Sequence, residues 1–119
     1  MTSEISWILT SRVTTTDPSA FEGLMQEMCG AYKENLPGTL AMIWYLSEDS
    51  QTCQLFVTVD RNETALIYHE RFLTHFKARF EALMIPEAMV VYGDASTDLK
   101  AMLSSYDATY VKTVGGFVR

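Results

Sequence analysis

His69 is the residue of this sequence whose type and spacing best suit proton transfer. It falls on an apolar stripe of helical period, between Leu66 and Leu73, which would turn its imidazole toward the interior. An imidazole titrates near neutral pH and can therefore take a proton from a phenol or an enol. The alternative is a structural histidine whose ring is satisfied by a backbone carbonyl or a tyrosine hydroxyl. The sequence offers His69 as a candidate catalytic base.

A second set of residues could contact a substrate. Aromatic side chains on the strands could form the walls of a site for a flat ring, although aromatics at strand spacing are also ordinary core residues. Arg12 is a cation on an inward face of its strand and needs a partner, for which Asp60 or a bound anion would serve. The predicted substrate-binding residues are Arg12, Trp44, Tyr45, Phe56, Thr58, His75 and Tyr92.

The segment around His75 is basic in an otherwise acidic chain. Residues 61–79 hold four cations and two histidines against two acids, a local field that could attract a phenolate, carboxylate or phosphate. The alternative is a solvated helix face with an intrahelical pair such as Lys77–Glu81. The sequence shows no Ser-His-Asp order, phosphate-binding glycine loop or metal-ligand cluster, and neither a metal nor another cofactor is expected.

The 119 residues fit a single domain, residues 1–119, because 48% of them are apolar and the length leaves no room for two cores. A net charge of −6 argues against nucleic acid and against a polybasic membrane anchor. No stretch approaches the roughly 18 apolar residues that cross a bilayer. The start lacks the cations of a secretory signal, so Cys29 and Cys53 are expected to be reduced thiols in a cytoplasmic protein.

The hydrophobic pattern predicts alternating strands and helices. Residues 5–13 alternate as a strand, and Asp17-Pro18 is typical of a helix start that leads to Asn35. Residues 39–47 are apolar on both faces, as expected of a strand buried on two sides, and they form a hairpin with 52–60. Asn62 is the expected N-cap of a second helix to about Met84, with Thr74 able to cap a restart. The last strand of this order is 89–93.

This βαββαβ order predicts a ferredoxin-like α+β fold, in which two helices cover one face of a four-stranded antiparallel sheet. An extra C-terminal helix is expected after Ser96 or Thr97. It is followed by an aromatic segment over 106–110 and by a Gly115-Gly116 turn into Phe117-Val118.

The uncovered face of the predicted sheet is too apolar for water. Ile8, Phe56 and one alternating set within 41–46 would lie on it, with either Val90 and Tyr92 or Met89 and Val91. An apolar patch of that size marks an interface, and a two-fold homodimer would bury it. The alternative is a monomer in which the tail, 106–119, folds back over the sheet.

Several stretches taken together resemble the antibiotic biosynthesis monooxygenase superfamily, over roughly residues 5 to 118. They are Pro37-Gly38-Thr39-Leu40 with Trp44–Asp49, Asn62–Leu66 with His69 and His75-Phe76, Val91-Tyr92-Gly93-Asp94, and the closing Gly115-Gly116-Phe117. The resemblance implies a dimeric α+β barrel with a pocket between each sheet and its helices. It also implies a small aromatic or hydrophobic ligand, because well-studied members oxidise phenols and quinols with O₂ and no cofactor.

The sequence departs from two patterns of that family. Its oxygenases often place an Asn within the third strand and a Trp near its end, where this chain has Phe56 and Asp60-Arg61. Its haem-degrading members need a His late in the second helix, where Arg79 stands, so haem degradation is not expected.

Three functions follow from these residues. The first is a small-molecule enzyme of the cofactor-independent monooxygenase type, in which His69 removes a proton from a quinol or aromatic phenol inside an apolar pocket. The second is a non-catalytic dimeric module that binds a hydrophobic ligand or only assembles. The third is an isomerase of a small enolisable compound, which would use the same base without consuming O₂.

Overall fold

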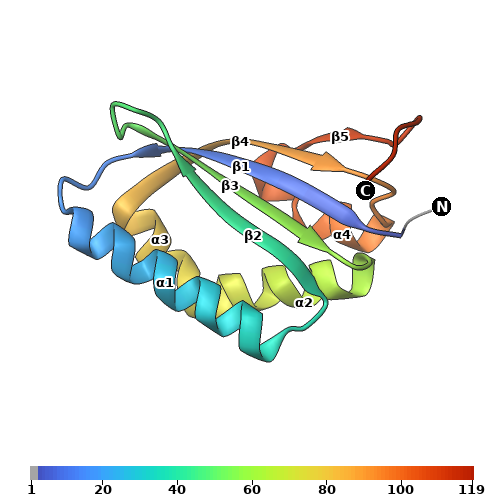
Figure 1. The fold of residues 1–119 in the computed structure, drawn as a ribbon, viewed down its shortest axis with the longest axis horizontal. Helices are drawn as coiled ribbons and strands as arrows, with labels where there is room; N and C mark the ends of the chain where they lie inside the picture. Colours follow the sequence, from blue (N-terminus) through green and yellow to red (C-terminus); the bar gives the residue numbers. More distant parts are fainter. Residues whose placement is uncertain (1–2) are drawn as a thin grey trace.

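The computed structural model describes residues 3–119, which form one five-stranded sheet with helices packed on one face (Figure 1). The strand order is β2-β3-β1-β4-β5, in which β5 is parallel to β4 and every other pair is antiparallel. The two edges, β2 and β5, stay apart, so the sheet is not closed into a barrel within one chain. The strands are β1 (Ile5–Val13), β2 (Thr39–Leu46), β3 (Thr52–Val59), β4 (Met84–Tyr92) and β5 (Thr109–Val111).

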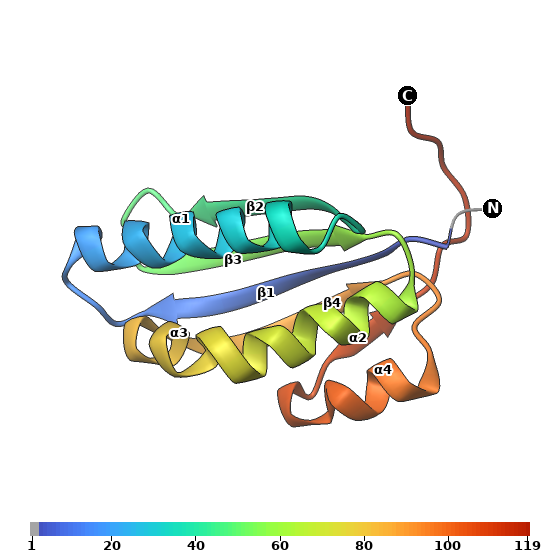
Figure 2. The same cartoon turned by 90° about the horizontal axis from the view of Figure 1, so that it is seen from below.

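Two long helical segments lie side by side beneath the sheet (Figure 2). The first is α1, and the second runs through α2, a π-helical turn and α3 without leaving the helical path. The bounds are α1 (Pro18–Asn35), α2 (Asn62–Arg71), the π turn η1 (Phe72–Phe76), α3 (Lys77–Leu83), α4 (Thr97–Met102) and the 3₁₀ turn η2 (Ser104–Tyr106). The predicted βαββαβ order and the ferredoxin-like α+β class are confirmed, with a helix and a strand added at the C-terminal end. Within residues 3–119, no helix combines the length and apolar character that crossing a lipid bilayer requires.

The elements with the clearest hydrophobic period form where predicted. Ile5, Trp7 and Leu9 of β1 are buried against the helices, and every second residue of β3 from Cys53 to Val59 is buried beside them. At the start of α1, the Asp17 carboxylate accepts hydrogen bonds from the backbone N–H groups of Ser19 and Ala20. That carboxylate satisfies two of the amides that a helix N-terminus leaves unpaired.

β2 differs from its prediction because it is an edge strand and none of its residues is buried. Met42 and Trp44 are partly buried against the core, whereas Leu40, Ile43, Tyr45 and Leu46 are exposed, Tyr45 by 55%. An apolar run shows that a strand prefers to avoid water, but it does not show what covers it. The expectation of a strand buried on two sides within one chain is therefore wrong.

The second helical segment departs from a regular α-helix. Asn62 is its first residue rather than its N-cap, and the Asn62 amide instead bonds Asp94 O and the backbone N–H of Ser96 across the next loop. Thr74 caps no restart, because its hydroxyl donates to the Glu70 carbonyl four residues back. The helix continues through η1, where one turn is wider. Its buried residues accordingly shift to Tyr68 and Phe72, while Leu73 is exposed.

The C-terminal region extends the sheet instead of covering it. β4 begins at Met84, before Pro86, and a register shift opposite Thr10 and Ser11 accommodates that proline. The Ser96 hydroxyl caps α4 as predicted, accepting from Leu99 N–H. The extra strand is β5, and the residues after it are exposed, with Phe117 81% exposed. Residues 106–119 therefore do not fold over the open side of the sheet, which was the expected arrangement in the monomeric alternative.

The face of the sheet away from the helices is here called the open face. The pairing register puts β2 residues 41, 43 and 45 on it, which settles the set that the sequence left undecided, and it selects Val90 with Tyr92 on β4. The apolar members of the open face are Ile8, Ala41, Ile43, Tyr45, Phe56, Ile85, Val90, Tyr92 and Val111.

Replacement of Gly38 by alanine is expected to destabilise the fold by about 1–3 kcal/mol. A Cβ at this position would lie 2.7 Å from the Thr64 hydroxyl and 2.8 Å from an Asp60 carboxylate oxygen, which are themselves bonded at 2.5 Å. Gly30→Ala is the control, because nothing lies within 4 Å of a Cβ there and the helix interior favours alanine. Urea unfolding measures both variants, and equal stability changes would contradict this account.

Candidate functional site

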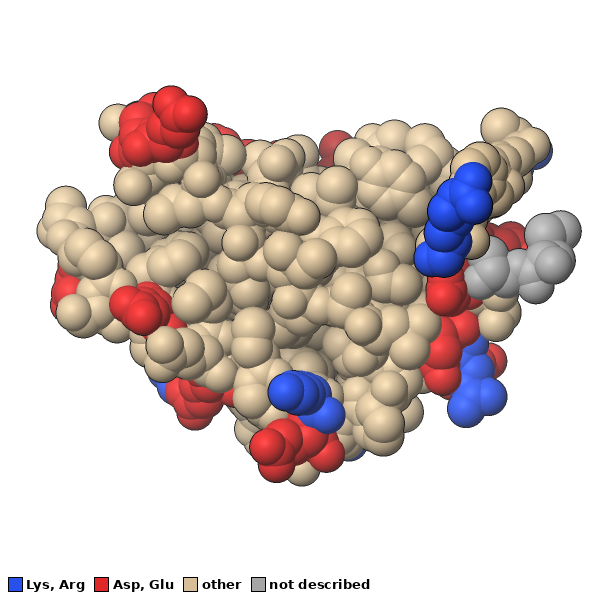
Figure 3. All heavy atoms as spheres, in the orientation of Figure 1, with Lys and Arg blue, Asp and Glu red and all other residues tan. Residues whose placement is uncertain are grey.

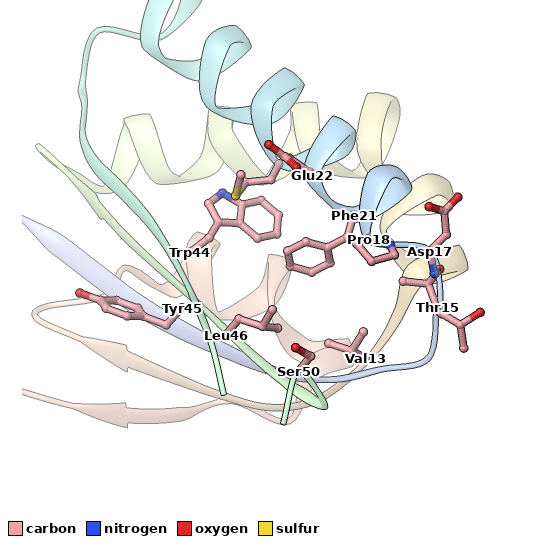
Figure 4. Close-up of a pocket in the computed structure, with 12 residues that line it drawn as sticks. Val13, Thr15, Asp17, Pro18, Phe21, Glu22, Trp44, Tyr45, Leu46 and Ser50 are labelled. Carbon is pink, nitrogen blue, oxygen red and sulfur yellow. Dashed lines mark hydrogen bonds between the residues drawn. The ribbon is translucent and has the colours of Figure 1, made fainter. Parts of the chain in front are cut away.

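A cavity of about 470 Å³ opens between the start of α1, the end of β2 and the loop that leaves β1 (Figure 4). We call it the β2–α1 cavity. Its lining is mainly apolar, with two acids at the helix start. The face of the molecule that β2 and α1 form carries few charged side chains around its centre (Figure 3). The lining residues are Val13, Thr15, Thr16, Asp17, Pro18, Phe21, Glu22, Met25, Trp44, Tyr45, Leu46 and Ser50.

Trp44 is the central side chain of this cavity. Its ring stands edge-on to Phe21 with the centroids 5.9 Å apart, and Phe80 packs beneath it at 6.1 Å. The indole Nε1 is shielded from solvent and has no hydrogen-bond partner. A buried N–H donor without an acceptor is costly, and a ligand oxygen that displaced the side chains covering it would satisfy it. Tyr45 also borders the cavity, but its ring points away from Trp44 and Phe21 (Figure 4).

Two carboxylates reach the cavity. Asp17 is engaged as the cap of α1, whereas Glu22 has only a 3.2 Å bond from the Gln26 amide to one oxygen. Glu22 is therefore the acid beside the cavity that the helix cap does not use. Sequence reasoning missed it because its position on α1 lies off the apolar stripe.

His69 lies in the core, 4% exposed, and its imidazole packs 4.5 Å from the Trp7 ring and 5.1 Å from the Tyr68 ring. Nε2 has no hydrogen-bond partner, and the Tyr68 hydroxyl is also unpaired. Burial lowers the pKa of His69 to about 3, which leaves the ring neutral at pH 7. The inward orientation agrees with the prediction, and among the two ring nitrogens Nε2 is the one left without a partner.

His69 is not among the residues that line the β2–α1 cavity. It contacts Trp7 of β1. Trp44 pairs with Leu55, which pairs with Leu9, so Trp44 lies two strands across and two residues along from Trp7. The structure therefore does not bring the predicted base next to the cavity.

Most of the other predicted contact residues lie on the open face. Thr58 bonds Ser6 there at 2.8 Å, and Phe56 and Tyr92 border the same surface. Arg12 is exposed and pairs with Glu87 at 3.5 Å, so the expected partner Asp60 is wrong. Asp60 instead binds Thr64 and lies 4.0 Å from Arg61.

His75 lies in a third place, a groove of about 390 Å³ between α1 and the second helical segment. We call it the α1–η1 groove. Arg79 reaches across it to the Glu27 carboxylate, and this contact raises the pKa of Arg79 and lowers that of Glu27. The pair crosses between helices, and the expected pair Lys77–Glu81 is absent among the ion pairs of residues 3–119. The groove is lined by Glu27, Ala31, Tyr32, Asn35, Arg71, His75, Phe76 and Arg79.

Neither cysteine is in a disulfide, as expected, and burial raises the pKa of the Cys53 thiol to about 11. Within the described part of the chain, no group of three or more His, Cys, Asp or Glu side chains is placed to hold a metal ion.

Solved structures share this fold at low sequence identity. MupZ from Pseudomonas fluorescens superposes with a TM-score of 0.86 at 12% identity, covering 100% of this chain and 91% of that one. SnoaB from Streptomyces nogalater, a cofactor-independent oxygenase, gives 0.65 at 15% identity over 80% and 96% of the two chains. A candidate antibiotic biosynthesis monooxygenase from Nitrosomonas europaea gives 0.65 at 19% over 82% and 95%.

No family model matches the sequence, and no curated protein sequence matches it. The similarity to known proteins is therefore a similarity of fold, and it agrees with the family that the sequence motifs resemble. The chain has the fold of the antibiotic biosynthesis monooxygenase superfamily.

Proposed function

We propose that the protein is a small-molecule enzyme of the cofactor-independent oxygenase type, which binds a flat phenol or quinol in the β2–α1 cavity. The observation that carries this proposal is the unpaired Nε1 of Trp44 in an apolar cavity. The volume of about 470 Å³ suits a ligand of a few fused rings. The aromatic ring would lie against Phe21 and Trp44, and its oxygen would accept the indole N–H.

The proposed reaction is the oxidation of a ring methylene to a carbonyl by O₂. A base removes a proton from the substrate and leaves a resonance-stabilised carbanion that reacts with O₂. One oxygen atom becomes the new carbonyl oxygen and the other leaves as water, so the four electrons that reduce O₂ come from the substrate carbon. A substrate that displaced water from this apolar cavity would favour this route, because it would protect the anion from reprotonation.

Two residues are candidates for the base. His69 is the sequence prediction, and its neutral ring with a free Nε2 is in the correct protonation state to accept a proton. Its low pKa makes it a weak base, which only a developing anion nearby would strengthen. Glu22 borders the cavity directly and is the candidate that the geometry adds.

Oxygen uptake with anthrone, whose enol form is a phenol, tests the proposal. Turnover is expected in the wild type, with a fall of about tenfold or more in Trp44→Phe, which keeps the ring but removes the N–H. Tyr110→Phe on β5 is the conservative control and should keep full activity. Loss of turnover in His69→Ala but not in Glu22→Gln would select His69 as the base, and the converse would select Glu22.

The same assay separates the alternatives. Absence of turnover with anthrone, together with saturable binding of 1-naphthol that requires Trp44, would replace the enzyme by a non-catalytic ligand-binding module. Conversion of an enolisable substrate without O₂ uptake would indicate an isomerase. Wild-type activity in Trp44→Phe, in His69→Ala and in Glu22→Gln, each tested as a single variant, would show that the substrate does not bind in the β2–α1 cavity.

The open face supports a homodimer. Ile43, Tyr45, Ile85, Tyr92 and Val111 are each at least 40% exposed on it, a density of large apolar side chains that a monomer rarely shows. Two sheets packed by their open faces would remove these side chains from water, as the resemblance implies.

Ile43→Lys is expected to dissociate this dimer, because it places a charge within the apolar interface. Sedimentation equilibrium at micromolar concentration measures the change in mass. Ile67→Lys is the matched control, since Ile67 is 40% exposed on α2 and faces away from the sheet. A wild type that sediments as a monomer contradicts the dimer.

A further inference from the structure

The α1–η1 groove places three basic or titratable side chains in a line, at a distance from the β2–α1 cavity. Arg71, His75 and Arg79 succeed one another at four-residue steps along the second helical segment. The opposite wall belongs to α1, which runs beside this segment (Figure 2) and contributes Glu27 and Asn35.

The charges in this groove do not balance. Arg79 is neutralised by Glu27 and its guanidinium lies 5.5 Å from the centre of the Phe76 ring. Arg71 is partly buried, and its Nη1 donates to the Asn35 carbonyl at 2.9 Å, yet it has no carboxylate partner among residues 3–119. The remaining N–H groups of Arg71 keep their capacity for a bidentate acceptor.

The π turn explains why the three side chains share one side of the helix. Lys77 N–H bonds Phe72 O, five residues back, which inserts one residue into a turn. Eight residues of regular α-helix cover about 2.2 turns and would rotate Arg79 by about 80° from Arg71. The inserted residue restores the spacing to about 1.9 turns, which lines the two guanidinium groups up again. Wide turns of this kind cluster at functional sites.

We propose that the α1–η1 groove binds the oxyanion group of a small molecule, a phosphate monoester or a carboxylate, between Arg71 and His75. The free N–H groups of Arg71 would hold two oxygens of the anion, and the His75 imidazole would add a third donor. Arg79 is held by Glu27 at the far end of the groove and leaves Arg71 as the cation without a carboxylate partner there. A small anion fits better than nucleic acid because the chain has a net charge of −6 and the groove is short.

Calorimetric titration with inorganic phosphate and with acetate, at constant ionic strength maintained with NaCl, tests this site. The wild type is expected to show saturable binding of at least one of the two, and the tighter one identifies the class of anion. Arg71→Gln should weaken binding by about tenfold or more. The affinity of Arg71→Lys should lie between those of the wild type and Arg71→Gln. Arg61→Gln, an exposed arginine at the start of α2, is the control and should bind as the wild type does.

A second variant guards against a structural explanation. Arg71→Gln also removes the bond to the Asn35 carbonyl, so His75→Ala, which leaves that bond intact, must weaken binding as well. The absence of saturable binding in the wild type overturns the proposal. Equal affinities of Arg71→Gln and Arg61→Gln, or wild-type affinity in His75→Ala, overturn it too.

Discussion

Acidification from pH 7 to pH 4 is expected to lower the free energy of unfolding by about 3 kcal/mol through His69 alone. Its pKa is about 3 in the folded protein, against 6.5 in an unfolded chain, because burial excludes the charged ring. Between these two values the unfolded chain binds a proton that the folded protein does not. Stability from this residue is therefore complete above pH 6.5 and is lost progressively as the pH falls toward 3.

His69→Leu isolates this effect from the titration of the carboxylates. Leucine fills a similar volume without an unpaired nitrogen, so the variant should be at least as stable at pH 7 and lose about 3 kcal/mol less on going to pH 4. His75→Gln removes the other, exposed histidine and should keep the wild-type slope. Urea unfolding at several pH values measures both, and parallel curves for wild type and His69→Leu would contradict the prediction.

Truncation of Phe80 to alanine is expected to destabilise the fold by about 3–5 kcal/mol and to weaken ligand binding in the β2–α1 cavity. Phe80 is completely buried and packs against both Trp44 and Phe72. Its removal leaves a void beneath the Trp44 ring, which would then no longer be held in one orientation. Urea unfolding measures the first effect, and calorimetric titration with 1-naphthol measures the second, expected at about tenfold.

Phe72→Ala separates the two effects. Phe72 is also buried and its ring lies 5.3 Å from that of Phe80, but it has no ring contact with Trp44. It should lose a similar amount of stability and retain the affinity for 1-naphthol. Equal losses of affinity in the two variants would mean that general loosening of the core, rather than support of Trp44, governs binding.

Elements whose hydrophobic pattern is compatible with only one type of secondary structure could be predicted from the sequence. β1 and β3 alternate strictly because one face packs on helices, and α1 begins where an acidic cap precedes a proline. The second helical segment could be predicted in extent, but its wide turn could not. A π turn depends on tertiary packing around Phe72 and Phe76, and no periodicity in the sequence indicates it.

β2 shows the limit of hydrophobic patterning more sharply. An uninterrupted apolar run predicts shielding from water, and the same run serves a central strand or an edge strand that a second chain covers. Composition does not distinguish these two cases. The position of β2 at the edge follows from the strand order, which is a property of the whole chain.

The candidate site could be predicted residue by residue but not as an arrangement. His69 was expected to face the helices, and it does, whereas the sequence left the inward side of residues 39–47 open and the structure turns Trp44 toward the helices. Alternation within a strand determines the side of the sheet to which a residue belongs. Whether a residue borders the cavity depends on strand order and pairing register, and these leave His69 outside the cavity lining although Trp44 lies only two strands across from Trp7.

The free edge of β2 carries eight consecutive residues without a charge or a proline. Such an edge can accept hydrogen bonds from any extended chain, and lysines or kinks normally block it. Subunits held apart by mutation of the open face would display this strand and are expected to precipitate or form fibres on concentration. Assembly would then act as protection against aggregation, and substitution of a lysine on β2 would be a way to keep isolated subunits in solution.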